Sequence, residues 1–172
     1  GNIMGKIYYV MGKSASGKDT IYKRLVKKMP ELGTVRMYTT RPIRDGETNG
    51  VEYIFTDEKQ LQAMKDAGKV IECRTYDTIY GPWSYFTADD GQIDLGSCSY
   101  LMMGTLESYE GLCKYYGAEV MVPLYIHVED GVRLQRALNR ENTQKNPKYA
   151  EMCRRFLADE KDFSKERLDQ CG

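Results

Sequence analysis

The pattern Gly-x-x-x-x-Gly-Lys at residues 12–18 constrains this chain more than any other feature of its sequence. Residues 6–11 (KIYYVM) form a short apolar run typical of a buried strand, and residues 19–29 carry apolar side chains at helical spacing. The pattern therefore stands between a predicted strand and a predicted helix, the context in which such a loop binds the phosphates of a nucleotide. A chain built around this unit is expected to be an α/β protein.

The chemistry of the loop follows from its residue types. Glycine adopts backbone dihedral angles that other residues resist, so successive backbone N–H groups can point at phosphate oxygens. The start of the following helix adds its dipole, and Lys18 adds a positive charge that can reach the β- and γ-phosphates. The alternative, a glycine turn followed by a surface lysine, leaves the flanking strand and helix unexplained. The residues expected to bind ATP are Gly12, Lys13, Ser14, Ala15, Ser16, Gly17, Lys18, Asp19 and Thr20.

The residue after the lysine departs from the usual pattern. Asp19 stands where Ser or Thr normally gives a hydroxyl to Mg²⁺, and Thr20 follows one place later. Asp19 is a hard oxygen ligand that could bind the metal directly or through water. It could equally cap the helix, with Thr20 contacting the α-phosphate. Both assignments stay open, and Asp19 is the candidate Mg²⁺ ligand.

Strand-like and helix-like segments alternate along the rest of the chain. This alternation predicts an α/β fold with a mostly parallel central sheet flanked by helices, in a single domain over residues 4–172. Pro123 is expected to mark a bulge or a strand end in that sheet. Further strands are predicted at residues 34–38, 51–55, 69–76, 99–103 and 120–128, and further helices at residues 57–67 with Asp57 as N-cap, 105–116, from 129 to the polar segment 141–147, and from 148 onward.

Composition narrows the class of partner. The 25 basic and 25 acidic side chains cancel, so no overall field would hold the chain on nucleic acid or on anionic lipid. No apolar run approaches the roughly 18 residues of a membrane span. Five scattered cysteines and one histidine do not form a zinc motif, and reduced thiols indicate the cytoplasm. Small-molecule nucleotides are the expected partners, and the oligomeric state is left open.

Residues 38–55 (YTTRPIRDGETNGVEYIF) contain a second candidate anion site. Arg41 and Arg44 are separated by a short turn that contains a proline, and Tyr53 follows further along. Guanidinium groups bind phosphate through paired hydrogen bonds, and a phenol can add a neutral one. A solvated, charged loop is the alternative. With the nucleotide loop upstream, the pattern favours a site for a second phosphate.

This segment resembles the signature of the guanylate kinase family, Thr-Thr-Arg-x-x-Arg-x-Gly-Glu-x-x-Gly-x-x-Tyr-x-Phe. The resemblance extends from residue 6 to about residue 163, and it implies a P-loop kinase fold with an acceptor-binding arm at residues 37–96 set in a core of residues 4–36 and 97–172. It also implies that Arg41, Arg44, Tyr53 and Tyr80 hold the phosphate of an acceptor nucleotide and that Glu72 faces guanine. The matching residues are Thr39, Thr40, Arg41, Arg44, Gly46, Glu47, Gly50, Tyr53 and Phe55.

The same resemblance implies a helical lid at residues 139–148. Arg136 and Arg140 share one face of a predicted helix, and Arg155 follows on the next helix. These three look like the family's lid arginines, which together with Lys18 and Mg²⁺ would neutralise the charge that develops during phosphoryl transfer. An exposed basic helix face is the alternative.

Several expected base-reading positions differ from the family pattern. Met37 stands where Ser or Thr usually binds guanine, and Pro82 stands where a small hydroxyl residue usually follows the Tyr-Gly pair. Met102 opens the run MMG that replaces a strand Asp-x-Asp. Sequences of the family usually end with a strand near an Asn-Asp pair that lies beside adenine. This sequence instead ends with residues 169–172 (DQCG). Either the sequence is truncated there or adenine is held differently.

The sequence therefore predicts ATP-dependent phosphoryl transfer to a nucleoside monophosphate, with conversion of GMP to GDP as the first candidate. Losing base-binding groups should change the preferred acceptor or the rate. A related small P-loop kinase that acts on another nucleotide or on a sugar phosphate fits the same loop and arginines. A non-catalytic guanylate-kinase-like binding module is the third hypothesis, although such modules lose the lysine loop that this chain keeps.

Overall fold

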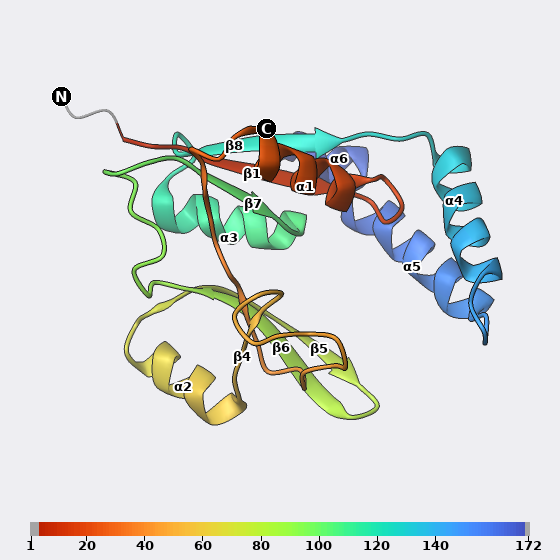
Figure 1. Ribbon diagram of the computed structural model, residues 1–172, viewed down its shortest axis with the longest axis horizontal. Coiled ribbons are helices and arrows are strands. Elements are labelled where there is room, and N and C mark those ends of the chain that lie inside the picture. The colour runs from red at the N-terminus through yellow and green to blue at the C-terminus, as the bar shows by residue number, and fades with distance from the viewer. Residues whose placement is uncertain (1–3, 171–172) are drawn as a thin grey trace.

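The computed structural model describes residues 4–170, so that Cys171 and Gly172 of the predicted domain lie outside the described residues. Its core is a four-stranded sheet of order β2-β7-β1-β8 in which every neighbouring pair is parallel (Figure 1). This sheet confirms the predicted α/β fold. The core strands are β1 (Ile7–Gly12), β2 (Gly33–Thr34), β7 (Tyr100–Met103) and β8 (Met121–Ile126).

Burial explains why β1 lies inside the sheet. Nearly all of its residues are buried, and Ile7 and Tyr9 enter the main apolar core. Parallel strands joined by helices are covered on both faces, so they consist of nearly continuous apolar residues. Val10 pairs with Met103, so the loops after β1 and β7 leave the sheet at the same edge. Ligands of open α/β sheets bind at this carboxyl edge.

A second sheet, of order β4-β3-β6-β5, lies beside the core (Figure 1). β3 is parallel to β4 and antiparallel to β6, and β6 forms an antiparallel hairpin with β5. Helix α2 covers this sheet through Leu61, which packs with Phe86. We call this sheet together with α2 the arm. Its elements are β3 (Tyr38–Thr39), β4 (Ile54–Phe55), α2 (Glu58–Asp66), β5 (Val70–Thr78) and β6 (Gly81–Ala88).

The remaining helices cover the core sheet or project from it. Helices α1 and α3 pack on the sheet, and α4 and α5 form a pair at one end of the molecule (Figure 1). Asp57 caps α2 by accepting a hydrogen bond from the Gln60 N–H, as the sequence predicted. Thr105 caps α3 in the same way. The helices outside the arm are α1 (Lys18–Lys28), α3 (Leu106–Tyr116), α4 (Asp130–Asn142), α5 (Tyr149–Asp162) and α6 (Lys165–Gln170).

The prediction for Pro123 was wrong. Pro123 lies within β8 and pairs in regular register with Tyr9. Because β8 is an edge strand, the missing N–H of proline can face away from the neighbouring strand without breaking the ladder.

The arm differs most from the sequence prediction. The predicted strand at residues 51–55 is shortened to β4, and the one at residues 34–38 is divided between β2 and the start of β3. Strand β6 was not predicted, because Gly81 and Pro82 at its start are residues typical of turns. These strands are short or irregular in sequence, and their pairing depends on partners that are distant along the chain.

Among residues 4–170, no helix is both long and apolar enough to cross a bilayer. Within the same range, no group of three or more His, Cys, Asp or Glu side chains is arranged to hold a metal ion. Cys73, Cys98, Cys113 and Cys153 are free thiols.

Candidate nucleotide and acceptor site

The glycine loop joins the carboxyl end of β1 to the first turn of α1, as predicted. Gly17 has a φ of 85° and stands at the N-cap of α1, a left-handed conformation that glycine adopts without strain. Gly12 is needed for a different reason, because a Cβ there would lie 2.8 Å from the Ser16 hydroxyl and 2.9 Å from the Ile126 carbonyl oxygen. Ala15 has a φ of 60° although it carries a side chain, which costs about 1 kcal/mol.

The residues after the loop form the first turn of α1. Helix α1 begins at Lys18, whose side chain is half-buried, and its first-turn N–H groups have no partner within the helix. Asp19 and Thr20 follow in the same turn and are exposed. Mg²⁺ commonly takes one or two carboxylates and completes its shell with water and phosphate oxygens. A single exposed carboxylate beside the loop therefore fits this ion.

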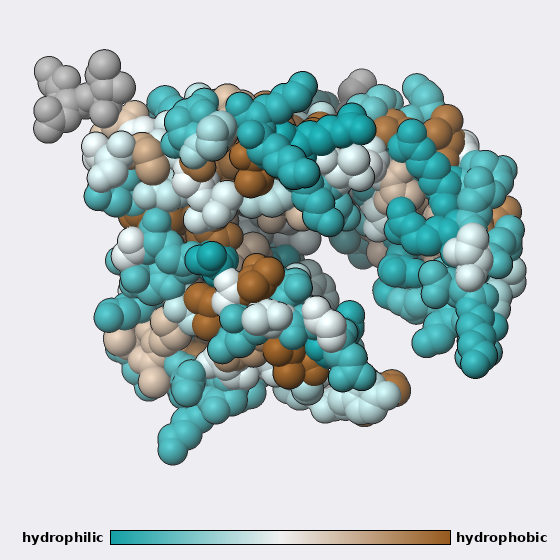
Figure 2. Space-filling view, in the orientation of Figure 1, coloured by the Kyte–Doolittle hydropathy of each residue, from teal (hydrophilic) through white to brown (hydrophobic). Residues whose placement is uncertain are grey.

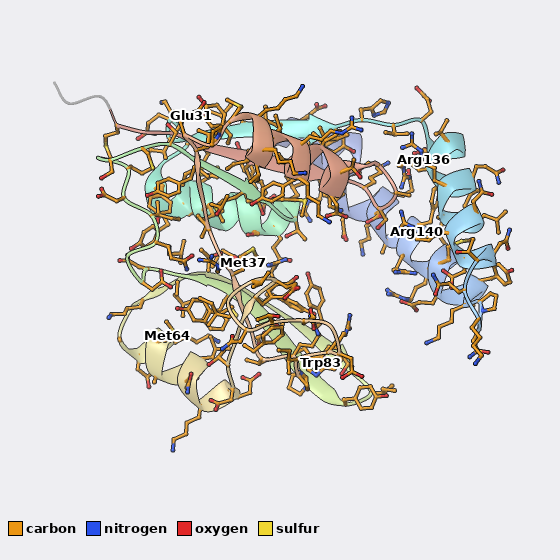
Figure 3. The ribbon with its side chains drawn as sticks, viewed as in Figure 1. Glu31, Met37, Met64, Trp83, Arg136 and Arg140 are labelled. Carbon is orange, nitrogen blue, oxygen red and sulfur yellow. The ribbon has the colours of Figure 1, made fainter. Side chains whose placement is uncertain are left out.

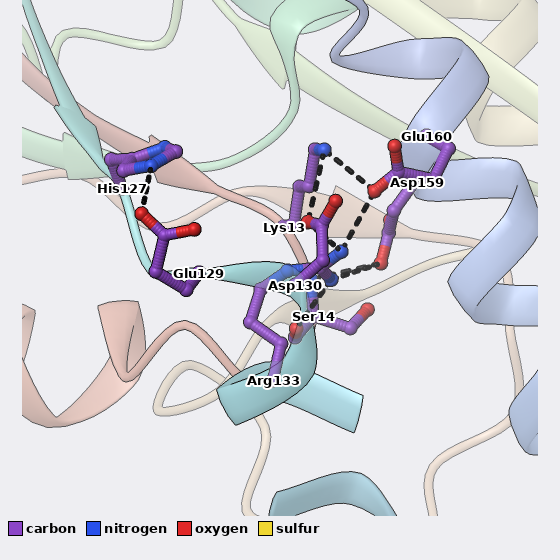
Figure 4. A network of polar contacts seen from close by, with 8 residues as sticks. All are labelled: Lys13, Ser14, His127, Glu129, Asp130, Arg133, Asp159 and Glu160. Atoms are coloured by element: carbon purple, nitrogen blue, oxygen red, sulfur yellow. Dashed lines mark hydrogen bonds and ion pairs between the residues drawn. The ribbon is translucent and has the colours of Figure 1, made fainter. Parts of the chain in front are cut away.

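A network of ion pairs holds the outer side of the loop (Figure 4). Arg133 of α4 is only 1% exposed, and its Nη1 donates to the carbonyl oxygen of Ser14 at 3.1 Å. The N–H of Ser14 donates to Oδ2 of Asp159 at 2.9 Å. Glu160 of α5 accepts from the Lys13 ammonium at 2.7 Å and from Arg133 at 2.9 Å. Both backbone polar groups of Ser14 are thus engaged, which fixes the path of the chain into the loop.

Arg133 was not predicted as a site residue. Its partners Ser14 and Glu160 are 119 and 27 residues away along the chain, so no local pattern joins them. The one local signal is Asp130, which pairs with Arg133 one helical turn away at 3.0 Å. That pair alone is common on helix surfaces and does not predict burial.

The three predicted lid arginines also lie beside the loop. Arg136 and Arg140 are one turn apart on α4 (Figure 3). The Nη1 of Arg136 is 3.4 Å from the carbonyl oxygen of Ala15. Arg140 and Arg155 line a cavity of about 50 Å³ that Ala15 also lines. Helices α4 and α5 therefore bring three guanidinium groups to the glycine loop.

In the arm, Arg41 is 4% exposed and forms a bidentate ion pair with Glu47. The Nη1–Oε1 and Nη2–Oε2 distances are both 2.9 Å. This hydrogen bonding lowers the pKa of Glu47 to about 2. The ring centre of Tyr53 lies 5.6 Å from the guanidinium carbon of Arg41, so the structure brings these two predicted residues together. An acceptor phosphate would share Arg41 with Glu47.

Arg44 and Tyr80 lie at more exposed positions. Arg44 contacts Glu47 through its backbone N–H at 2.8 Å, and its side chain is exposed. Tyr80 is 76% exposed in the turn between β5 and β6, where its ring stacks on Trp83 with 6.0 Å between ring centres. Figure 3 shows Trp83 toward the far end of this hairpin. Tyr80 therefore contacts an aromatic residue of its own hairpin, whereas Tyr53 contacts Arg41.

Glu72 lies on β5 where the arm meets α3. The two elements are so close that a Cβ on Gly111 of α3 would lie 2.6 Å from the Cβ of Glu72. Its Oε1 accepts a hydrogen bond from the Thr87 hydroxyl at 2.8 Å, and its Oε2 lies 3.3 Å from Nε of Arg74. Arg74 in turn donates from Nη1 to the Thr105 hydroxyl at 3.2 Å. Arg74 was not predicted as a site residue. The signal was present, because residues two apart in a strand share one face of the sheet.

The loop and the arm border a common hollow. Figure 2 shows the surface indented between the arm and the α4–α5 pair, and the α4–α5 side of the hollow is mainly hydrophilic in this view. The glycine loop lies at its upper end in the orientation of Figure 1. This is an α/β protein with the P-loop kinase fold. The fold is defined by the parallel sheet, by the glycine loop after an inner strand, and by the arginine-bearing helices beside that loop.

A solved structure shares this fold. The crystal structure of guanylate kinase from Anaplasma phagocytophilum aligns with a TM-score of 0.58 and 20% sequence identity, over 79% of this chain and 68% of that protein. At this level of identity the likeness concerns the fold.

The sequence relatives specify the family. The family model of guanylate kinase matches residues 4–84. The guanylate kinase of Legionella pneumophila (strain Lens) is 37% identical over 78 residues, which are 45% of this chain and 37% of that protein. The guanylate kinase of Coxiella burnetii is 37% identical over 76 residues, 44% of this chain and 37% of its own length. The match thus spans little more than a third of these relatives. The family match and these relatives confirm the predicted resemblance to guanylate kinases over residues 4–84.

Proposed function

We propose that this chain transfers the γ-phosphoryl group of ATP to a nucleoside monophosphate, with GMP as the first acceptor. The observation that carries the proposal is the position of Arg136, Arg140 and Arg155 beside the loop that ends at Lys18. Phosphoryl transfer spreads negative charge over the oxygens of the moving group, and converging cations stabilise that charge. Binding of a nucleotide alone would not require this many guanidinium groups.

On the donor side, the N–H groups of the loop and of the first turn of α1 would bind the phosphates of ATP. Lys18 would neutralise the β- and γ-phosphates. Asp19, or Thr20 in its place, would hold Mg²⁺, which when bound neutralises charge on the phosphate oxygens. The ion pair of Lys13 and the hydrogen bonds of Ser14 would reduce the ordering that the loop needs when ATP binds.

On the acceptor side, Arg41, Arg44 and Tyr53 would bind the phosphate of the acceptor. Glu47 holds the guanidinium of Arg41 in place, so little side-chain freedom is lost when the phosphate arrives. Tyr80 would contribute once its hairpin approaches the acceptor. The family resemblance adds Glu72 as the contact to guanine.

The reaction would take place across the hollow between the loop and the arm (Figure 2). An oxygen of the acceptor phosphate attacks the γ-phosphorus in line, and the bond from that phosphorus to the β–γ bridging oxygen breaks. Catalysis then consists of positioning and charge neutralisation. Closure of the arm and of the predicted lid would exclude water and limit wasteful hydrolysis of ATP.

The test is an assay of the full chain with ATP, Mg²⁺ and a panel of acceptors: GMP, dGMP, AMP, CMP, UMP and ribose 5-phosphate. We expect ADP formation that depends on GMP. Lys18→Ala should abolish turnover while urea unfolding changes by less than about 0.5 kcal/mol. Lys23→Ala, on an exposed position of α1, is the matched control and should keep activity.

Three results would count against this proposal. Full activity of Lys18→Ala would remove the mechanism. Turnover of another acceptor without turnover of GMP would favour the related kinase. Failure to bind ATP would favour the non-catalytic binding module.

A further inference from the structure

Arg74 is a buried charged group of the arm that the proposed mechanism does not use. It is 7% exposed, and it lies where β5 faces the carboxyl end of the core strand β7. Thr105, which accepts its hydrogen bond, lies just beyond the carboxyl end of β7, at the edge of the sheet where the glycine loop also emerges. Arg74 therefore lies between the arm and the core, on the side where the acceptor must be held for transfer.

Arg74 changes what Glu72 can do. Glu72 is 8% exposed, and each of its carboxylate oxygens already has a partner, the Thr87 hydroxyl for one and Arg74 for the other. A carboxylate recognises an edge with two N–H donors, such as that of guanine, by accepting with both oxygens. Paired and buried in this way, Glu72 has less capacity left for such an edge, and the Glu72–Arg74 pair has no net charge to attract it.

Within the arm, the aromatic groups near Arg74 do not replace the hydrogen-bond acceptors that Glu72 would have offered to a base. The ring of Tyr85 lies 5.9 Å from its guanidinium carbon, and Tyr76 packs against Tyr85 with 5.9 Å between ring centres. Aromatic faces bind bases by stacking, which tolerates every base. Another carboxylate of the arm, Glu47, is bound to Arg41. Specific recognition in the arm is therefore concentrated on the phosphate.

We propose that Arg74 is a specificity-determining residue that neutralises Glu72 and so makes the acceptor site discriminate weakly between guanine and other bases. This inference rests on the proposed function. The acceptor is recognised mainly through its phosphate by Arg41 and Arg44, and its base is stacked more than it is read. Removing the guanidinium releases Glu72, which then selects for an N–H edge.

The experiment compares kcat/KM for GMP with kcat/KM for AMP in the full chain. We expect the single substitution Glu72→Gln, with Arg74 retained, to change this ratio by less than about threefold. Arg74→Met should raise the GMP/AMP ratio by about tenfold or more, because a free carboxylate distinguishes the two edges. Adding Glu72→Gln to Arg74→Met should cancel the gain, which links the effect to this pair.

A fold defect does not mimic this result. Partial unfolding of Arg74→Met lowers the rates with both nucleotides equally and leaves their ratio unchanged. Equilibrium binding of GMP and AMP in the absence of ATP gives a second measure that does not depend on turnover. Arg154→Met, which breaks an exposed ion pair with Glu151 on α5, is the matched control and should leave the ratio unchanged.

Two outcomes overturn the inference. If Glu72→Gln alone lowers kcat/KM for GMP by tenfold or more and spares AMP, then Glu72 reads guanine despite Arg74, and the proposed function stands while the role of Arg74 falls. If no monophosphate is phosphorylated by the unmodified chain, the proposed function fails and this inference fails with it.

Discussion

The Nη1 atom of Arg133 donates a hydrogen bond to the carbonyl oxygen of Ser14 at 3.1 Å, so a buried arginine of α4 holds the glycine loop directly. The guanidinium carbon also lies 4.5 Å from the ring centre of Phe156 on α5. Arg133 thus joins the loop, α4 and α5 into one packed unit. A displacement of α4 or α5 would therefore be transmitted to the glycine loop through this residue.

We expect Arg133→Met to lower the free energy of unfolding by about 2 kcal/mol, because it leaves the Ser14 carbonyl without its donor and removes one of the cations that pair with Asp130 and Glu160. The loss stays moderate since Asp130 and Glu160 are partly exposed and can be solvated. The KM for ATP should rise as the loop loosens. Urea unfolding and ATP titration measure the two effects. Arg154→Met, at an exposed ion pair, should change neither, and equal effects of both variants would contradict this role.

The left-handed backbone of Ala15 predicts that a substitution by glycine does not lower the stability of the fold. Its left-handed backbone strains any residue with a Cβ, so Ala15→Gly should leave the free energy of unfolding unchanged or raise it by up to about 1 kcal/mol. Ala15→Val should lower it by about 1–2 kcal/mol, because a β-branched residue fits this conformation worse. At the exposed helical position Ala63, glycine should instead cost about 1 kcal/mol. Thermal unfolding compares the three, and a stability loss in Ala15→Gly would refute the argument.

The ion pair of Glu47 with Arg41 predicts a pH dependence. The pKa of Glu47 is lowered to about 2, below the ordinary value of about 4.3 for this side chain. A carboxyl group with a lowered pKa stabilises the fold when it is ionised. The contribution is therefore present above about pH 4.3 and is lost as the pH falls toward 2.

Urea unfolding of Glu47→Gln at pH 6, 4 and 3 measures this contribution. The variant should be less stable than the unmodified chain at pH 6, and the difference should shrink as the pH falls. Glu31→Gln, at an exposed position before β2, is the control and should show no such trend. A constant difference across this range would show that Glu47 acts through something other than its charge.

Arg140 provides a test of the arginines beside the loop. If the proposed transfer takes place, Arg140→Ala should lower kcat by about 100-fold, since a guanidinium that stabilises the transferred group contributes several kcal/mol. Its unfolding free energy should change by less than about 0.5 kcal/mol. Steady-state kinetics of Arg140→Ala and Arg154→Ala make the comparison. Equal rates in the two variants would place Arg140 outside the reaction.

Local patterns predicted the parts of this protein that depend on neighbouring residues. Residues 12–18 predicted the loop between β1 and α1, and Asp57 predicted the cap of α2, because a cap acts within one helical turn. The motif around Arg41 predicted the resemblance to guanylate kinases, and the family model matches residues 4–84. The roles assigned to the lid arginines and to Glu72 remain predictions.

Long-range contacts account for what the sequence did not predict. Strand β6 begins with residues that indicate a turn, and it forms only because β3 and β5 supply its hydrogen bonds. Pro123 indicated a break, and its place at the sheet edge removes the cost. In both cases the deciding partner lies far away along the chain.

By itself the sequence determined that a glycine loop stands between a strand and a helix, because that unit is built from consecutive residues. Only the tertiary structure decided what surrounds the loop and what Glu72 contacts. Arg133 became part of the loop through burial between α4 and α5, and Arg74 reached Glu72 and Thr105 where the arm meets the core. A charge removed from water must find partners wherever the fold places it, and the fold supplies those partners from distant parts of the chain.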